Sequence, residues 1–106
     1  GPYHPSFRQL VESEIYKDMI NSILDSVLTN PYANISISFN FSDYSNIIGQ
    51  KKSNVKYFND KHPNATFSFV NGDINTGSVC VKIDEHLYNL SKKEYYENIK
   101  ACCNKM

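Results

Sequence analysis

Apolar side chains recur every three or four positions over residues 7–28, and most charged residues of this segment fall on the opposite side. This spacing predicts a long amphipathic helix. Ser6 is its expected N-cap, Gln9 completes a capping box, and Asn30-Pro31 ends the helix. We expect the helix to dock on the core of the domain through its apolar face. The alternative is a helix that offers this face to a partner or to a second copy of the chain.

Three later segments alternate apolar and polar residues, which is the pattern of half-buried strands. They are residues 35–41, 66–70 and 78–83, and Phe41 closes the apolar face of the first. Residues 71–77 are rich in turn-forming Asn, Gly and Asp, so the second and third strands are predicted to form an antiparallel hairpin with a mobile loop. Three strands with one apolar face each predict a sheet that helices cover on one side.

Two short helices are predicted between the first and second strands. The first is capped by Ser42 or Asp43 and ended by Gly49. The second begins with Ser53 as its cap and ends at His62, which precedes a proline. The chain therefore returns to the sheet after a helix, a tight loop and another helix.

A last helix is marked by its start. Ser91 and Glu94 form a capping box, and Leu90 and Tyr95 are placed to form a hydrophobic staple. The positions expected to face the core are Tyr95, Ile99, Cys102, Cys103 and Met106.

The tight loop carries a recognisable motif. Residues 47–56 read Ile-Ile-Gly-Gln-Lys-Lys-Ser-Asn-Val-Lys and resemble the I-I-G-x-x-G-x-x-I-K motif of eukaryotic-type (type I) KH domains. The resemblance covers residues 34–106 and looks closest to KH domains of the Bicaudal-C and vigilin kind. It implies an α+β fold in the order β-α-α-β-β-α, with a three-stranded antiparallel sheet covered on one face by helices. The chain then divides into an expression scar at residues 1–2, an N-terminal helical extension at residues 3–33 and a KH-like domain at residues 34–106.

The resemblance also implies a binding site for single-stranded RNA. In KH domains the GxxG loop brings backbone N–H groups close to the phosphates of about four nucleotides. Carried onto this chain, the RNA-binding residues are Ile48, Gly49, Gln50, Lys51, Lys52, Asn54, Val55 and Lys56. The bases would lie in a groove bordered by Ile48, Val55 and residues 67–69.

One residue departs from the motif, since Lys52 stands where KH domains carry the second glycine. A side chain there obstructs the approach of a phosphate or requires backbone angles that cost free energy. KH domains with damaged loops often bind proteins instead. Two hypotheses therefore stay open: a module that binds single-stranded RNA weakly, and a scaffold that binds a protein or dimerises through the N-terminal helix or a sheet edge. Either suits post-transcriptional regulation of mRNA in the cytoplasm.

Charge bears on this choice. The chain has 11 basic and 11 acidic residues, so its net charge of zero argues against a domain that holds nucleic acid by bulk positive charge. The charge is unevenly distributed, however, because residues 1–34 carry two basic and four acidic groups, whereas residues 35–63 carry four lysines and two aspartates. Those lysines are Lys51, Lys52, Lys56 and Lys61. They indicate either a local phosphate clamp of modest affinity or a solvated lysine-rich loop.

Other classes of function have little support in the residues. His4, His62 and His86 are isolated, and no nucleophile-elbow, P-loop or zinc-protease motif is present, so we expect no enzyme, cofactor, metal or small-molecule substrate. Three cysteines, with no spaced pair, form neither a disulfide framework nor a zinc site, which favours a reducing intracellular compartment. The Asn-x-Ser/Thr sequons at Asn34, Asn40, Asn64 and Asn89 are mostly expected by chance in an Asn-rich and Ser-rich chain. No apolar run is long enough to span a membrane.

Overall fold

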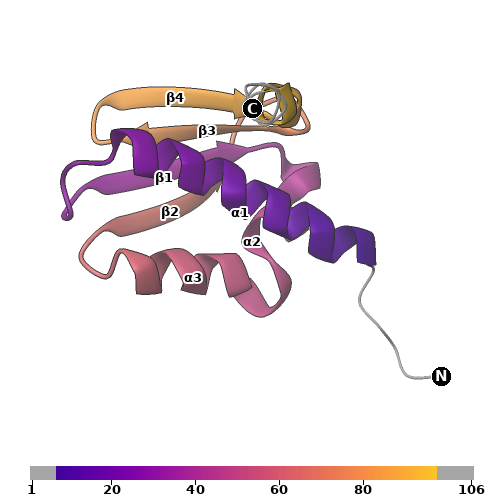
Figure 1. Ribbon diagram of the computed structural model, residues 1–106, viewed down its shortest axis with the longest axis horizontal. Coiled ribbons are helices and arrows are strands. Elements are labelled where there is room, and N and C mark those ends of the chain that lie inside the picture. The colour runs from indigo at the N-terminus through magenta and orange to yellow at the C-terminus, as the bar shows by residue number, and fades with distance from the viewer. Residues whose placement is uncertain (1–6, 98–106) are drawn as a thin grey trace, which may run out of the picture.

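A four-stranded mixed sheet and the helices on one of its faces make up an α+β fold (Figure 1). The computed structural model describes residues 7–97. Their elements are α1 (Phe7–Val27), β1 (Asn34–Phe39), η1 (Phe41–Asp43), α2 (Tyr44–Ile48), η2 (Gln50–Lys52), α3 (Ser53–Lys61), β2 (Thr66–Asn71), β3 (Ser78–Ile83) and β4 (His86–Ser91), where η marks a 3-10 turn. Residues 92–97 are helical. The predicted cap Ser6 and the predicted core positions Ile99, Cys102, Cys103 and Met106 lie outside the described residues.

The strands are ordered β2-β1-β3-β4, and this corrects the predicted three-stranded antiparallel sheet. β1 pairs with β2 in parallel and with β3 in antiparallel fashion, while β3 and β4 are antiparallel. β2 runs parallel to β1 because α2 and α3 lie between them and carry the chain back to the end of the sheet where β1 began. The fold class was predicted, but the direction of β2 was not.

The predicted hairpin of the second and third strands is wrong as well. β2 and β3 lie on opposite sides of β1, since Phe39 is aligned with Asn71 on one side and with Val79 on the other. Adjacent strands are about 4.8 Å apart, so residues 72–77 have to bridge about 10 Å past the end of β1. Six residues reach that far with room to spare. This connection lies against the chain that leaves β1, and Asn40 Nδ2 donates a hydrogen bond of 3.0 Å to the carbonyl of Ile74.

β4 was not predicted. A two-residue turn at Asp84-Glu85 joins it to β3, with Asp84 in the left-handed region at φ 54°. Tyr88 and Leu90 pair with the buried Val81 and Val79 and are themselves partly buried against the core. Ser91 is confirmed as the cap of the last helix, because the Glu94 backbone N–H donates to Ser91 Oγ at 3.1 Å, and the Glu94 carboxylate accepts from the same hydroxyl at 3.0 Å.

The core lies between the helices and one face of the sheet. α1 crosses this face (Figure 1) and buries four side chains completely or nearly so, which are Tyr16, Met19, Ile20 and Leu24. They pack in one cluster with the inward residues of β1 and β3 and with Phe58 of α3. Burying a large apolar side chain contributes about 1.5–3 kcal/mol. The docking of the first helix on the core is therefore confirmed, and its apolar face is used inside the domain.

The other face of the sheet carries mostly polar side chains. Ser36 on β1, Ser68 on β2 and Lys82 on β3 are aligned across it, and Cys80 lies one row further along. The buried apolar side chains of β1 and β3 lie on the face toward α1, as the period-two pattern predicted, while Val70 and Leu87 are apolar residues among the outward positions of β2 and β4.

Candidate nucleic-acid interface

Gly49 shapes the loop that the KH resemblance singled out. It ends α2 with φ 85° and ψ 166°, and its N–H donates to the carbonyl of Ser45 at 3.0 Å. This backbone conformation is almost restricted to glycine. A Cβ at position 49 would also overlap Ser53 Oγ and come within 3.0 Å of the Asn54 backbone nitrogen. The prediction that Gly49 terminates the short helix is confirmed, and the close approach of α3 explains why a glycine is needed.

The next two lysines are held in an unusual backbone conformation. Lys51 has φ 54° and ψ 33°, and Lys52 has φ 60° and ψ 33°. The left-handed region costs a residue with a Cβ about 1–2 kcal/mol. The expectation that a side chain in place of the second glycine would demand costly backbone angles is therefore confirmed at Lys52.

The same loop leaves the start of α3 without a capping side chain. Lys52, not the predicted Ser53, is the N-cap residue, and its side chain makes no capping hydrogen bond. Ser53 is instead the first helical residue, so the helix begins one residue earlier than predicted, directly after the left-handed Lys52. The first N–H groups of a helix need acceptors from outside the helix, so this end of α3 is suited to accept an anion.

A single substitution measures the strain in this loop. Lys52→Gly is expected to raise the free energy of unfolding by about 0.5–1 kcal/mol, because glycine adopts the left-handed conformation without the penalty of a Cβ. Lys56→Gly is the matched control, since it replaces another exposed lysine within α3 and should lower stability by about 1 kcal/mol. Urea unfolding followed by circular dichroism gives both values. Equal losses in the two variants would contradict the strain at Lys52.

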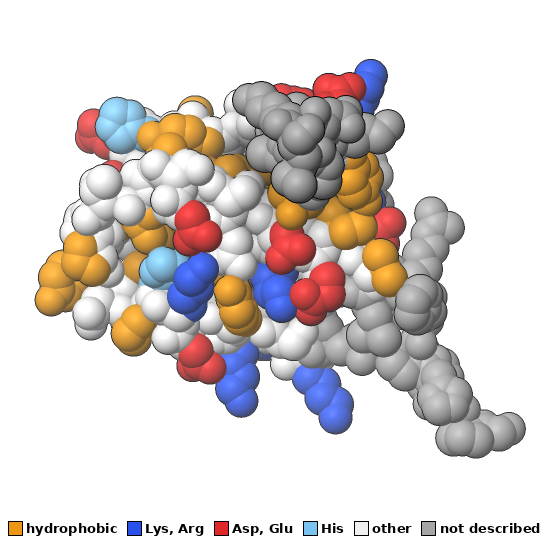
Figure 2. All heavy atoms as spheres, viewed as in Figure 1, with side chains coloured by type: hydrophobic (Ala, Val, Ile, Leu, Met, Phe, Trp, Pro, Cys, Tyr) orange, Lys and Arg blue, Asp and Glu red, His pale blue; other side chains and the backbone are white. Residues whose placement is uncertain are grey.

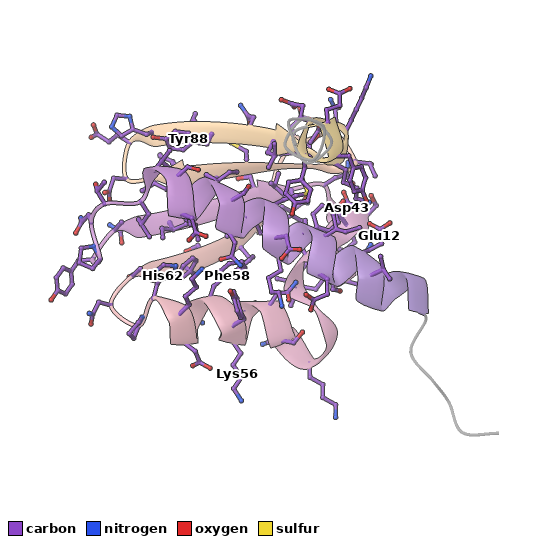
Figure 3. All side chains as sticks on the ribbon, in the orientation of Figure 1. Glu12, Asp43, Lys56, Phe58, His62 and Tyr88 are labelled. Carbon is purple, nitrogen blue, oxygen red and sulfur yellow. The ribbon has the colours of Figure 1, made fainter. Side chains whose placement is uncertain are left out.

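All four clustered lysines are exposed, but they differ in whether they have partners. Lys51, Lys52 and Lys56 make no ion pair with any described residue, and Figure 3 shows Lys56 pointing away from the fold. Basic side chains project from this side of the molecule beneath α3 (Figure 2). Lys61 differs, because its Nζ lies 3.0 Å from Asn21 Oδ1 and 3.3 Å from Asp25 Oδ1, both on α1. The positive surface therefore consists of Lys51, Lys52 and Lys56. We use the name lysine loop for these three residues together with Gly49 and Gln50.

Asn54 and Ile48 lie in the interior instead. Asn54 is 4% exposed, and its Nδ2 donates to the carbonyls of Ser13 in α1 and Ile47 in α2, both at 3.0 Å. Ile48 is 6% exposed, and Val55 is half-buried. Of the residues predicted to bind RNA, the structure thus presents the lysines to solvent and gives the Asn54 amide a structural role.

Sequence patterns placed Phe41 on the buried face of a strand, and this was wrong. β1 ends at Phe39, and Asn40 turns the chain because its Oδ1 accepts a hydrogen bond of 2.9 Å from the Ser42 backbone N–H. Phe41 is consequently 70% exposed and stacks on Tyr44, with ring centroids 6.2 Å apart and planes at 25°. The signal available in the sequence was Asn40 itself, because asparagine two residues before serine favours such a turn.

A buried polar cluster lies at the same end of the sheet. Asp43, 5% exposed, accepts a hydrogen bond of 2.9 Å from the Gly77 backbone N–H, so it anchors the connection before β3 instead of capping α2. Burial, and then the neighbouring Asp43 carboxylate, raise the pKa of the Tyr16 hydroxyl well above its ordinary value. Glu12, which Figure 3 shows at this end of α1, forms an ion pair with Lys92. The Glu12–Lys92 pair joins α1 to the last helix, and the Asp43–Gly77 hydrogen bond ties the segment that carries Phe41 and Tyr44 to the connection before β3.

Within residues 7–97, no group of three His, Cys, Asp or Glu side chains is arranged to hold a metal ion. No helix in this part of the chain is both long enough and apolar enough to cross a bilayer. Comparison with known proteins found no matching family model, no significantly similar curated protein and no significantly similar solved structure.

Proposed function

We propose that this chain is a KH-like module that binds single-stranded RNA weakly through the lysine loop and the first turn of α3. The observation that carries the proposal is the position of Lys51, Lys52 and Lys56, which are exposed and free of ion pairs with described residues at a helix start that has no side-chain cap. Ammonium groups and the partial positive charge of a helix N-terminus attract the same phosphates. In this proposal the module belongs to a post-transcriptional regulator of mRNA in the cytoplasm.

The local arrangement supports the KH-like part of the proposal better than the sheet does. A strand, a short helix ending in Gly49, a tight loop and a second helix follow one another as the motif requires. The parallel β2 and the additional β4 depart from the type I sheet. The proposal therefore depends on the loop and its charges, and not on the topology of the sheet.

The number of exposed lysines limits the affinity for RNA that we expect. Three lysines can neutralise about three phosphates, and each such contact contributes about −0.7 to the slope of log K against log salt for a single strand. The net charge of zero adds no long-range attraction. Binding is accordingly expected to be weak and to lose about 20-fold in affinity between about 50 and 200 mM salt.

Removing two of the contacts tests the site directly. For Lys51→Gln/Lys52→Gln, the loss over the same salt range should shrink to about threefold, because one phosphate contact is left. The control is Lys82→Gln/Lys93→Gln, which removes the same charge from two exposed lysines elsewhere and should behave like the unmodified protein. The measurement is fluorescence anisotropy of a labelled uridine octamer at several salt concentrations. Absence of saturable binding at low salt, or the same salt dependence in all three proteins, would refute RNA binding at this loop.

A protein-binding scaffold is the second candidate, and the edge strands favour it. Val70 on β2 is 42% exposed and Leu87 on β4 is 63% exposed, and both strands lie at an edge of the sheet. The apolar face of α1 is buried in the core, so an interface would use an edge strand, which can pair with a strand of a partner. The salt titration separates the candidates, because an edge-strand interface does not depend on Lys51 or Lys52.

A further inference from the structure

Phe41 and Tyr44 form an aromatic surface that the core does not require. Phe41 is 70% exposed and Tyr44 is 44% exposed, and the two rings are stacked with 6.2 Å between their centroids. A phenylalanine left in solvent gives up most of the stabilisation that its burial would provide. The exposed face of this pair is therefore a surface on which a flat apolar group could gain by stacking.

The pair is held in place by hydrogen bonds on both sides of Phe41. Asn40 accepts from the Ser42 N–H at 2.9 Å and donates to the Ile74 carbonyl at 3.0 Å. Asp43 is fixed through its carboxylate to the Gly77 N–H at 2.9 Å. Tyr44 also contacts the buried Phe39, with 6.0 Å between ring centroids. Since these contacts order the rings before any ligand arrives, little conformational entropy remains to be lost on binding.

The pair lies next to the lysine loop. Tyr44 is the first residue of α2, and Gly49 follows its last. A five-residue helix spans about 7.5 Å, so the aromatic pair and the positive loop flank the same short element. Figure 1 shows α2 leading from the end of β1 toward the loop that precedes α3. A polyanion that carries flat bases complements both features, whereas an apolar peptide would complement only the aromatic pair.

We propose that Phe41 and Tyr44 form a stacking platform for a base of the single strand whose phosphates bind the lysine loop. This inference rests on the proposed function and adds the residues that would contact a base. Stacking on an aromatic ring tolerates any base, because every base has a π-face. The platform would add affinity with little sequence preference.

A single tryptophan at the platform tests the stacking itself. The chain contains no tryptophan, so Phe41→Trp introduces one indole whose emission reports on the platform alone. A uridine octamer should quench this emission saturably, over the same concentrations at which anisotropy shows binding. An octamer of abasic nucleotides has the same phosphates and should bind the lysine loop without quenching.

A second substitution measures what the ring contributes. Phe41→Leu keeps an apolar side chain but removes the ring, and it should weaken uridine-octamer binding by at least about fivefold, the lower end of the effect of losing a base–aromatic stack. It should leave binding of the abasic octamer unchanged. Tyr32→Leu is the matched control, because Tyr32 is also 70% exposed but lies in the turn before β1, and its loss should change neither affinity.

The outcomes separate this inference from the function on which it rests. Uridine-octamer binding without quenching, and unchanged by Phe41→Leu, would overturn the platform and leave the lysine loop as the RNA site. Binding of neither octamer would overturn both. Emission that shifts with protein concentration and not with RNA would identify the pair as a contact between protein molecules, which also overturns the platform.

Discussion

Asn54→Ala is expected to lower the free energy of unfolding by about 2–3 kcal/mol, because it removes the donor of two buried hydrogen bonds. The Asn54 amide joins three helices, with both of its carbonyl partners, on Ser13 and Ile47, 3.0 Å away. The side chain is 4% exposed, so little water can replace it. Leaving a buried acceptor without a partner costs about 1–3 kcal/mol.

Asn59→Ala is the control for this substitution. Asn59 is exposed on the same helix, so the two variants share the gain in helix propensity and differ in the buried hydrogen bonds. Urea unfolding followed by circular dichroism measures both. A difference below about 0.5 kcal/mol, the usual range of surface substitutions, would show that the two bonds contribute nothing to stability.

Gly49→Ala is the second substitution with a large expected effect, and we predict a loss of about 3 kcal/mol. Gly49 has φ 85° and ψ 166°. This backbone conformation costs a residue with a Cβ about 1–3 kcal/mol. A Cβ would in addition press on Ser53 and on the Asn54 backbone nitrogen, 3.0 Å away. Because that nitrogen belongs to α3, relief would require the helix to move away from α2.

Gly77→Ala separates strain from contact. Gly77 has a similar φ of 87°, but a Cβ there would have no atom within 4 Å, so only the backbone penalty of about 1 kcal/mol is expected. Removing the Ser53 hydroxyl in Gly49→Ala/Ser53→Ala should recover part of the loss, and a double-mutant cycle gives that share. If Gly49→Ala were no more harmful than Gly77→Ala, the tight approach of α3 to the loop would be disproved.

Local patterns predicted the parts of the fold that depend on local physics. The alternation around Ile37 and Val81 identified two strands and their buried faces, because side chains on a strand point to opposite sides in turn. Gly49 marked the end of a helix for a similar reason, since its backbone conformation excludes other residues. Ser91 and Glu94 marked the start of the last helix through a hydrogen bond between near neighbours.

Most of the errors concern partners that are distant in sequence, and the end of the first strand is a local exception. Alternation at Phe67 and Phe69 shows that a strand exists but not which way it runs or which strand it joins, so the parallel pairing of β2 was missed. Phe41 continued the alternation of β1, yet the turn made by Asn40 ended the strand first. Sequence patterns also could not show that Asn54 and Lys61 contact α1, because their partners there are more than 30 residues away.

The central position of β1 has a consequence for synthesis of the chain. β1 is made early, but its two neighbours end at Asn71 and Ile83. At about 5–20 residues per second, the nascent strand waits several seconds for both partners. During that interval, both hydrogen-bonding edges of the strand are unpaired, and its alternating isoleucines and phenylalanine are exposed. Such a strand can pair with other nascent chains. α1 is already synthesised by then, and it can cover the apolar side chains of β1 before the sheet closes, because the two elements share one core cluster.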